Sequence, residues 1–323
     1  MQELINLSEI ITGDRIINIC DYVIITEEIF HFHRNITTFT NPQNIIVVKN
    51  FKDIDIKAEA YLRRCFEMFS SKKKSTCIKL FVYTHILDDF IKYILDILDK
   101  RFEYIIYIHN SDHHFNNHHQ SLLQSKHIAK VFSQNIDLSY LDSKLNFLPI
   151  GIANSMWKHG DISALYEVIN EISTLNKSKN LYVNINSNTF YYRKTILDAL
   201  SLSYNYHITM HSKPFKEYLH DLATHRFCLC VRGNGLDTHR FWESLYLGVI
   251  PVIINNRHTS MNNYLQYLKR INIPFFEIKE DDIDIITHKY LDGFFNEDLY
   301  NELMSKICSS IYDLDALRIS FYQ

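Results

Sequence analysis

Glycine and proline are scarce in this sequence, which has 7 glycines and 5 prolines among its 323 residues. The sequence also contains no short-period repeat and no low-complexity block. Glycine is needed where the backbone takes a positive φ or approaches a ligand closely, so the position of each glycine is informative. Three of the seven, Gly233, Gly235 and Gly248, fall in one short stretch. That stretch is therefore the first place to look for a functional site.

An excess of positive charge is also missing. The 34 basic residues are outnumbered by 37 acidic ones, which gives a net charge of −3 at pH 7. This balance excludes a general nucleic-acid or membrane-surface binder, because such proteins need a basic excess. It leaves room for a small basic pocket that binds phosphate. We expect no nucleic-acid partner.

No apolar run approaches the roughly 18 residues that a membrane span requires. The first residues contain no basic segment followed by an apolar one, so we expect no signal peptide and no membrane span. The six cysteines, at positions 20, 65, 77, 228, 230 and 308, show no C-x-x-C spacing. They are predicted to be reduced core thiols of a soluble cytoplasmic protein, with Cys228 and Cys230 buried on one face of a strand.

Length and hydrophobic pattern predict two α/β domains. A chain of this length exceeds one ordinary core, so two domains of roughly 150 residues each are expected. In the first half, strands are predicted at 21–26, 44–49, 78–84, 103–108, 128–133 and 146–150, with helices clearest at 55–70 and 86–100. In the second half, strands are predicted at 180–186, 205–210, 226–231, 249–254 and 273–278, and helices at 189–202, 213–224, 237–247, 260–270, 281–292 and from about 297.

This alternation of strands and helices is typical of parallel sheets covered on both faces. We expect two doubly wound, Rossmann-like domains, 1–160 and 161–323, that face each other across a cleft. The boundary is placed at the start of the polar segment 160–180. The C-terminal helix is a candidate to pack back on the first domain.

The stretch 226–254 predicts a strand, a glycine loop and a helix that begins at Asp237 or Thr238, either of which is a natural N-cap. Backbone N–H groups of such a loop and the positive end of the helix form an anion site. Arg240 in the first helical turn is disfavoured by the helix dipole unless an anion lies near it. The alternative is a solvated Arg240, or one paired with Asp237 or Glu243.

Glu243 follows Arg240 by three residues and shares its helix face, so its carboxylate could accept the hydroxyls of a ribose. A surface ion pair with Arg240 is the alternative. The loop is not the dinucleotide fingerprint G-x-G-x-x-G, and no G-K-[ST] follows it. Neither a Rossmann dehydrogenase nor a P-loop protein is supported.

The whole stretch resembles the exostosin family, the family 47 glycosyltransferases. The matching positions are Arg232, Gly233, Thr238, Arg240, Glu243, Ser244, Gly248, Ile250, Pro251 and Val252. The stretch departs from the family at Val231, where the family often has proline. Residues 148–152 (LPIGI) look like the family's segment that leads out of the first domain.

The resemblance implies a GT-B fold, a nucleoside-diphosphate-sugar donor (a UDP-sugar first) held by the C-terminal domain, and inversion at the anomeric carbon. No further cofactor and no metal are implied. The family's animal and plant members are usually Golgi-anchored, so this sequence looks more like soluble viral or microbial relatives. The expected donor-binding residues are Arg232, Gly233, Asn234, Gly235, Thr238, His239, Arg240 and Glu243. Asn186, Arg193 and His211 are added because they lie at predicted strand ends or in the next helix.

Five histidines and Asp112 lie between residues 109 and 119, directly after a predicted strand. Their spacing matches no known metal scheme such as H-E-x-x-H. An inverting transfer needs a general base near the acceptor hydroxyl, and residues at a strand's carboxyl end should line the cleft. Asp112 is the candidate base, followed by His109 and His113. The alternative is an Asp112 that only forms a turn.

The leading hypothesis is therefore an inverting glycosyltransferase acting on a glycan or glycoprotein acceptor. A catalytically inactive nucleotide-sugar or glycan-binding module of the same fold is the second hypothesis. A metal-dependent hydrolase that uses the histidine segment is the third.

Overall fold

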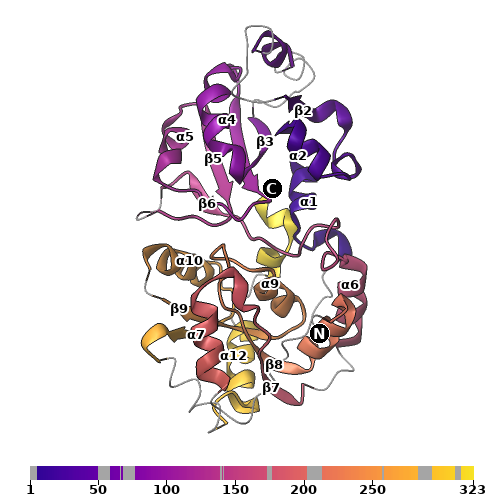
Figure 1. Ribbon diagram of the computed structural model, residues 1–323, viewed down its shortest axis with the longest axis vertical. Helices are drawn as coiled ribbons and strands as arrows, with labels where there is room; N and C mark the ends of the chain where they lie inside the picture. Colours follow the sequence, from indigo (N-terminus) through magenta and orange to yellow (C-terminus); the bar gives the residue numbers. More distant parts are fainter. Residues whose placement is uncertain are drawn as a thin grey trace. The chain divides into compact units, whose positions relative to one another are not determined.

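The computed structural model describes residues 6–49, 59–65, 67, 77–138, 140, 142–172, 177–201, 213–256, 258–282, 293–309 and 314–323. The chain divides into two compact units, drawn in Figure 1. The first unit comprises Thr12–Ile150 with Gln323, and the second comprises Gly151–Tyr322 with the residues up to Ile11. The predicted boundary at 160/161 therefore lies inside the second unit.

The first unit is built on a six-stranded sheet with the order β2-β1-β3-β4-β5-β6, and all its strand pairs are parallel. Its strands are β1 (Tyr22–Thr26), β2 (Ile45–Val48), β3 (Cys77–Tyr83), β4 (Glu103–His109), β5 (Ile128–Ser133) and β6 (Leu145–Phe147). Val23, Ile24 and Ile25 of β1 are fully buried, as expected where helices cover both faces of a sheet. The six strands predicted for the first half are confirmed.

The helices of the first unit are α1 (Gly13–Ile19), α2 (Glu27–Phe32), α4 (Leu87–Tyr93) and α5 (Gln120–Gln124). Single 3₁₀ turns lie at Leu7–Glu9 of the second unit and, in the first, at Ile36–Thr38, Pro42–Asn44, Thr84–Ile86, Leu95–Ile97 and Asn117–His119. The predicted helix 86–100 is shorter than expected. Half of the predicted helix 55–70 falls outside the described residues, and the described half, 59–65 and 67, is helical.

The strand order reverses between β1 and β3 in the first unit. Crossovers between parallel strands are right-handed as a rule, and with this strand order they place α2 on one face of the sheet and α4 and α5 on the other. Such a reversal is where ligands bind in open α/β sheets, outside the carboxyl ends of the strands. The first unit is thus doubly wound, as predicted.

The second unit has a four-stranded parallel sheet with the order β10-β9-β8-β7. Its strands are β7 (Lys179–Tyr182), β8 (His225–Leu229), β9 (Ile250–Asn255) and β10 (Phe276–Lys279). Its helices are α6 (Ile162–Glu171), α7 (Tyr192–Ser201), α8 (Phe215–Ala223), α9 (His239–Tyr246), α10 (Thr259–Arg270) and α12 (Glu297–Ser309), with 3₁₀ turns at Ser187–Thr189, Glu280–Asp282, Leu314–Leu317 and Ile319–Tyr322. The predicted strand 205–210 and nearly all of the predicted helix 281–292 lie outside the described residues.

The core of the second unit lies between this sheet and its helices. Phe227 of β8 is fully buried and packs against Phe295 and Tyr300, with ring centroids 5.2 and 6.1 Å apart. The Tyr300 hydroxyl donates to the carbonyl of Gly248 at 2.8 Å. Because Tyr300 belongs to α12, the C-terminal helix packs on this sheet. Burial of each such side chain stabilises the fold by about 1.5–3 kcal/mol.

Cys228 and Cys230 are 0% and 5% exposed, so the prediction of two buried thiols is confirmed. Among the helices of the described ranges, none has the length and apolar character needed to cross a bilayer.

Lys177 joins the ends of two helices of the second unit. Its ammonium donates to the carbonyls of Ala223 and Leu247 at 3.0 Å each, and to that of His225 at 3.4 Å. Ala223 ends α8 and Leu247 follows α9, so the cation lies at the negative ends of both helix dipoles. Burial, together with the charge of Arg226, nevertheless lowers the pKa of Lys177 to about 7.

This lowered pKa predicts a pH-dependent contribution of Lys177 to stability. The unfolded chain, with a lysine pKa of about 10.4, binds more protons than the folded chain between pH 7 and 10. The stability of the protein relative to a Lys177→Met variant should therefore rise as the pH increases from 7 to 10. Urea unfolding of both proteins measures the difference, with exposed Lys279→Met as the control. A difference that stays constant over this range would contradict the prediction.

Candidate functional site

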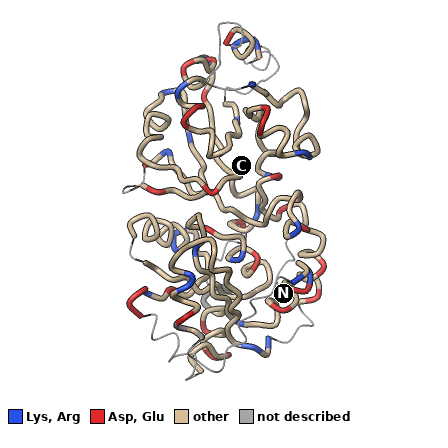
Figure 2. The backbone as a smooth tube through the Cα atoms, in the orientation of Figure 1, with Lys and Arg blue, Asp and Glu red and all other residues tan. Residues whose placement is uncertain are grey.

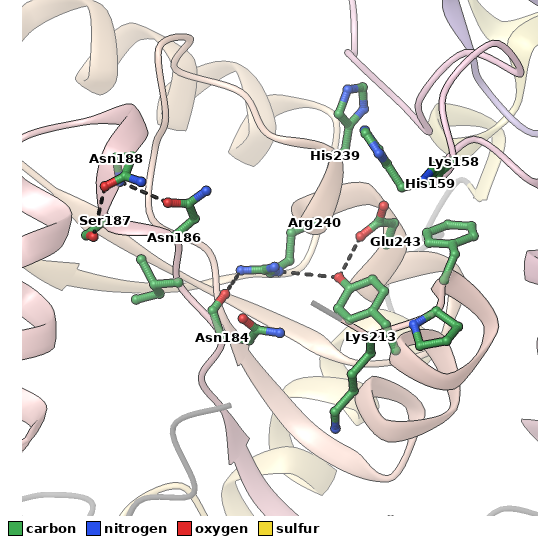
Figure 3. Close-up of a pocket in the computed structure, with 14 residues that line it drawn as sticks. Lys158, His159, Asn184, Asn186, Ser187, Asn188, Lys213, His239, Arg240 and Glu243 are labelled. Carbon is green, nitrogen blue, oxygen red and sulfur yellow. Dashed lines mark hydrogen bonds between the residues drawn. The ribbon is translucent and has the colours of Figure 1, made fainter. Parts of the chain in front are cut away.

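A cavity of about 1080 Å³ opens in the second unit (Figure 3). It is lined by residues 158–159, 184–188 and 213–215, by Tyr218 of α8, and by His239, Arg240 and Glu243 of α9. Residues 184–188 follow β7, and α9 follows β8 after one loop, so the cavity lies beyond the carboxyl ends of two parallel strands. This is the usual ligand position in open α/β sheets, and the volume suits a ligand of nucleotide size or larger.

The charged residues of the cavity lining are mostly basic. Lys158, Lys213 and Arg240 contribute cations, and Glu243 contributes a carboxylate. Figure 2 shows that basic and acidic residues are otherwise interspersed along this unit. Lys213 is partly neutralised, because its ammonium lies 2.7 Å from the Asp221 carboxylate. The cavity therefore favours an anionic ligand even though the chain as a whole is slightly acidic.

Arg240 is held in the middle of the cavity by two of its own donors. Its Nη1 donates to the carbonyl of Asn184, and its Nε donates to the Tyr218 hydroxyl at 3.3 Å. The guanidinium carbon also lies 5.6 Å from the centroid of the Tyr218 ring. No hydrogen bond of Nη2 is found within the described ranges, so this N–H group is available to a ligand.

Tyr218 links Arg240 to Glu243. Its hydroxyl donates to Glu243 Oε2 at 2.6 Å while accepting from Arg240, as the dashed lines of Figure 3 show. The direct ion pair that was the alternative for Arg240 and Glu243 is therefore replaced by a bridge through a phenol. Oε1 of Glu243 makes no hydrogen bond to any residue that the structure describes, so it can accept from a ligand hydroxyl.

Glu243 is only 4% exposed. Burial raises the pKa of its carboxyl, although the Tyr218 hydrogen bond and the charge of Arg240 oppose this shift. A buried carboxylate is stable only with such partners, so Tyr218 and Arg240 both serve to keep Glu243 in place.

Arg193 of α7 supports the glycine loop, residues 232–235, by hydrogen bonds to backbone carbonyls. Its guanidinium donates to the carbonyls of Val231 and Arg232 at 2.8 Å each, and to that of Asn186 at 3.1 Å. Burial, with a contribution from Arg240, lowers the pKa of Arg193 to about 10. Arg193 thus positions the backbone around the cavity, and it does not itself line the cavity.

Gly233 allows this close approach of Arg193. A Cβ atom at Gly233 would lie 3.3 Å from Arg193 Nη2, tighter than an ordinary contact. Of the three glycines in this stretch, only Gly248 after α9 has a positive φ, +63°. Gly248 thus serves the usual role of a glycine that ends a helix.

The other loop residues lie beside the cavity and do not line it. Arg232 stacks on Phe190, with its guanidinium carbon 4.6 Å from the ring centroid, and donates to the carbonyl of Asn234 at 3.3 Å. Of the predicted donor-binding residues, Arg232, Gly233, Asn234, Gly235, Thr238 and Arg193 are absent from the lining, whereas Asn186, His239, Arg240 and Glu243 belong to it. His211 lies outside the described residues.

The buried carboxylate of Asp237 accepts hydrogen bonds at the start of α9. Thr238 is the N-cap residue, but its side chain makes no capping hydrogen bond. Asp237 Oδ1 instead accepts from the Thr238 N–H, the Trp242 indole and the Tyr264 hydroxyl, each at 2.8 Å. This carboxylate already complements the helix dipole, so recognition of a ligand anion falls to side chains such as Arg240.

His239 and Asn186 complete the polar lining. His239 Nδ1 lies 2.8 Å from the carbonyl of Gly151, which can only accept, so Nδ1 carries a proton. The Asn186 side chain accepts from the Asn188 N–H at 3.0 Å and shapes the turn after β7. The ring centroid of His159 lies 6.1 Å from that of His239, and burial lowers the pKa of His159.

The three candidate bases of the first unit differ in accessibility. His109 is 2% exposed, with its ring nitrogens 2.9 Å from Asn110 Oδ1 and 3.0 Å from the Pro149 carbonyl, and burial lowers its pKa. It occupies the last position of β4 with its side chain inward, so it cannot contact an acceptor. Asp112 and His113 are exposed in the turn that follows.

His85 joins His113 at this edge of the sheet. It follows β3, the neighbour of β4, and its ring centroid lies 6.3 Å from that of His113. Burial and the proximity of His113 lower the pKa of His85. His85 was not among the predicted residues, although it also comes directly after a predicted strand.

The remaining histidines of the segment 109–119 do not converge. His119 accepts from the Asn116 N–H at 2.9 Å and lies 3.2 Å from Asp88, so it stabilises the 3₁₀ turn Asn117–His119 that precedes α5. Within the part of the chain that is described, no group of three or more His, Cys, Asp or Glu side chains is placed to hold a metal ion.

Several lining residues were missed by the sequence reasoning: Lys158, His159, Asn184, Lys213, Phe215 and Tyr218. Asn184 could have been found, because it lies near the carboxyl end of the predicted strand 180–186, two residues before Asn186. Tyr218 gave no signal, since it resembles any tyrosine of an amphipathic helix until α8 packs beside α9.

No model of a known protein family matches this chain, and a search of curated proteins finds no match to it.

The contacts of Arg193 predict that it stabilises the second unit. An Arg193→Met variant leaves three carbonyls without their donor, and unsatisfied groups of this kind cost about 1–3 kcal/mol each when buried. We expect the midpoint of thermal unfolding to fall by several degrees. Lys194→Met, at the exposed neighbouring position, is the control. Equal midpoints for both variants would show that these hydrogen bonds are dispensable.

Proposed function

We propose that the protein is an inverting glycosyltransferase of GT-B arrangement that moves a sugar from a nucleoside-diphosphate donor to a glycan or glycoprotein acceptor. The observation that carries the proposal is the basic cavity of the second unit, in which Tyr218 links Arg240 to Glu243. Arg240 and Glu243 are two residues of the exostosin-like stretch that line the same cavity, and this agreement supports a donor site.

The chemistry of each lining group fits one part of such a donor. Nη2 of Arg240, which makes no hydrogen bond to the described residues, can donate to a phosphate oxygen, with Lys158 as a further donor from the same lining. Oε1 of Glu243 can accept from the hydroxyls of a ribose. In the transfer, the leaving diphosphate gains negative charge, and fixed cations stabilise that charge most where water is partly excluded. Because these cations can neutralise the phosphates, the proposal requires no metal cofactor.

The acceptor hydroxyl must lose a proton to a general base. We propose Asp112 or His113 of the first unit for this role, since both are exposed at the carboxyl edge of its sheet. His85 is a further candidate because it lies beside His113. His109 is withdrawn because its ring is buried.

One observation favours a second candidate function. All residues that line the cavity belong to the second unit, so a nucleotide sugar could bind without any residue of the first. A non-catalytic nucleotide-sugar-binding module would need no more than this. Release of free sugar from a UDP-sugar by the purified protein would favour the enzyme over the binding module.

Replacement of Arg240 tests the donor site. An Arg240→Ala variant should bind UDP at least tenfold more weakly, because it loses a charge-assisted contact worth about 1.5–3 kcal/mol. Thermal shift with UDP measures this, since a ligand at a hundredfold excess over its Kd stabilises the folded protein by about 2.7 kcal/mol. Exposed Arg270→Ala is the matched control. UDP binding that survives Arg240→Ala unchanged would refute the assignment.

A further inference from the structure

Tyr218 contacts three other side chains of the cavity lining. Phe215 stacks on Tyr218, with ring centroids 6.1 Å apart and an interplanar angle of 29°. Tyr218 contacts Glu243 and Arg240 through its hydroxyl, and Arg240 donates to the carbonyl of Asn184. Figure 3 shows Glu243 on one side of Arg240 and Asn186 on the other. The cavity wall thus carries an aromatic ring, a carboxylate, a guanidinium and amides, with the carboxylate and the amides on opposite sides of the guanidinium.

Phe215 differs from the other carbocyclic ring of the lining. The Tyr218 ring is covered by the Arg240 guanidinium, and its hydroxyl is engaged on both sides. Phe215 is half-buried, and no cation of the described residues lies over its ring. It begins α8 directly after Pro214, whose fixed φ limits the freedom of the chain at this point.

A half-exposed phenyl ring in a basic, polar cavity calls for a ligand with both an anionic group and a flat apolar face. A nucleotide has both, in the order base, ribose, phosphate. Phe215, Glu243 and Arg240 supply one matching group for each of these three parts, and all three side chains contact Tyr218. A sugar phosphate or an inorganic anion would leave Phe215 without a partner.

We propose that the nucleobase of the ligand stacks on Phe215, so that the ribose lies at Glu243, the diphosphate at Arg240 and the transferred sugar toward residues 184–188. This inference rests on the proposed function and adds the orientation of the nucleotide-sugar donor in the cavity. Stacking accepts any base, because every base has a π-face, so Phe215 supplies affinity without choosing the base.

The test compares two anions that differ only in having a nucleoside. Isothermal titration measures the binding of UDP and of inorganic pyrophosphate to the whole chain and to a Phe215→Leu variant. Leucine keeps the apolar volume and removes the flat ring, so UDP binding should weaken by roughly tenfold, within the range of base–aromatic stacking. Pyrophosphate binding should stay the same. Phe275→Leu, at a half-buried phenylalanine outside the cavity, should change neither.

A second variant guards against a folding defect in the first. Phe215→Trp retains a flat ring and should bind UDP as well as the unchanged protein or more tightly. The inference is overturned if Phe215→Leu leaves UDP binding unchanged, if it weakens UDP and pyrophosphate equally, or if Phe215→Trp behaves like Phe215→Leu. If the unchanged protein binds pyrophosphate but neither UDP nor GDP, then the proposed function itself fails, and that result is distinct from the other three.

Discussion

The hydroxyl of Tyr218 is the contact on which the cavity depends. A buried carboxylate next to a guanidinium would ordinarily form a direct ion pair with it. The hydrogen-bonding atoms of each group would then be occupied by the other group. The phenol between Arg240 and Glu243 satisfies one atom of each and leaves one atom of each toward the ligand. A donor of Arg240 and an acceptor of Glu243 thus both remain available to a ligand, whereas a direct ion pair would leave neither available. The proposed contacts of Arg240 and Glu243 with a nucleotide follow from this arrangement.

The fold was largely predictable because its strands are buried on both faces. Such strands read as short continuous apolar runs, which is why β1, β4 and β5 were located almost to the residue. Helix ends were less predictable, since the stretch after Tyr93 keeps a helical pattern but continues as a 3₁₀ turn. Local periodicity cannot distinguish these two outcomes, because packing of the following residues decides between them.

The site was predictable only where it is local in sequence. Arg240 and Glu243 could be placed together because helical spacing alone puts them on one face. Tyr218 and Lys158 come from elements distant in the chain, so no pattern around Arg240 could point to them. His109 was misjudged for a different reason: the last residue of a strand faces either the interior or the solvent, and strand-end position does not say which. The role expected of the α9 start was also altered, since Asp237 already complements it.

Because Arg193 supports the glycine loop, the residues at positions 193 and 233, forty residues apart in the chain, depend on each other. Gly233 needs no unusual backbone angle, so what forbids a larger residue there is the guanidinium beneath it and not the geometry of the turn. The two positions should therefore change together in evolution. A relative with alanine at position 233 should have a shorter side chain at position 193, and it should support the loop by some other donor.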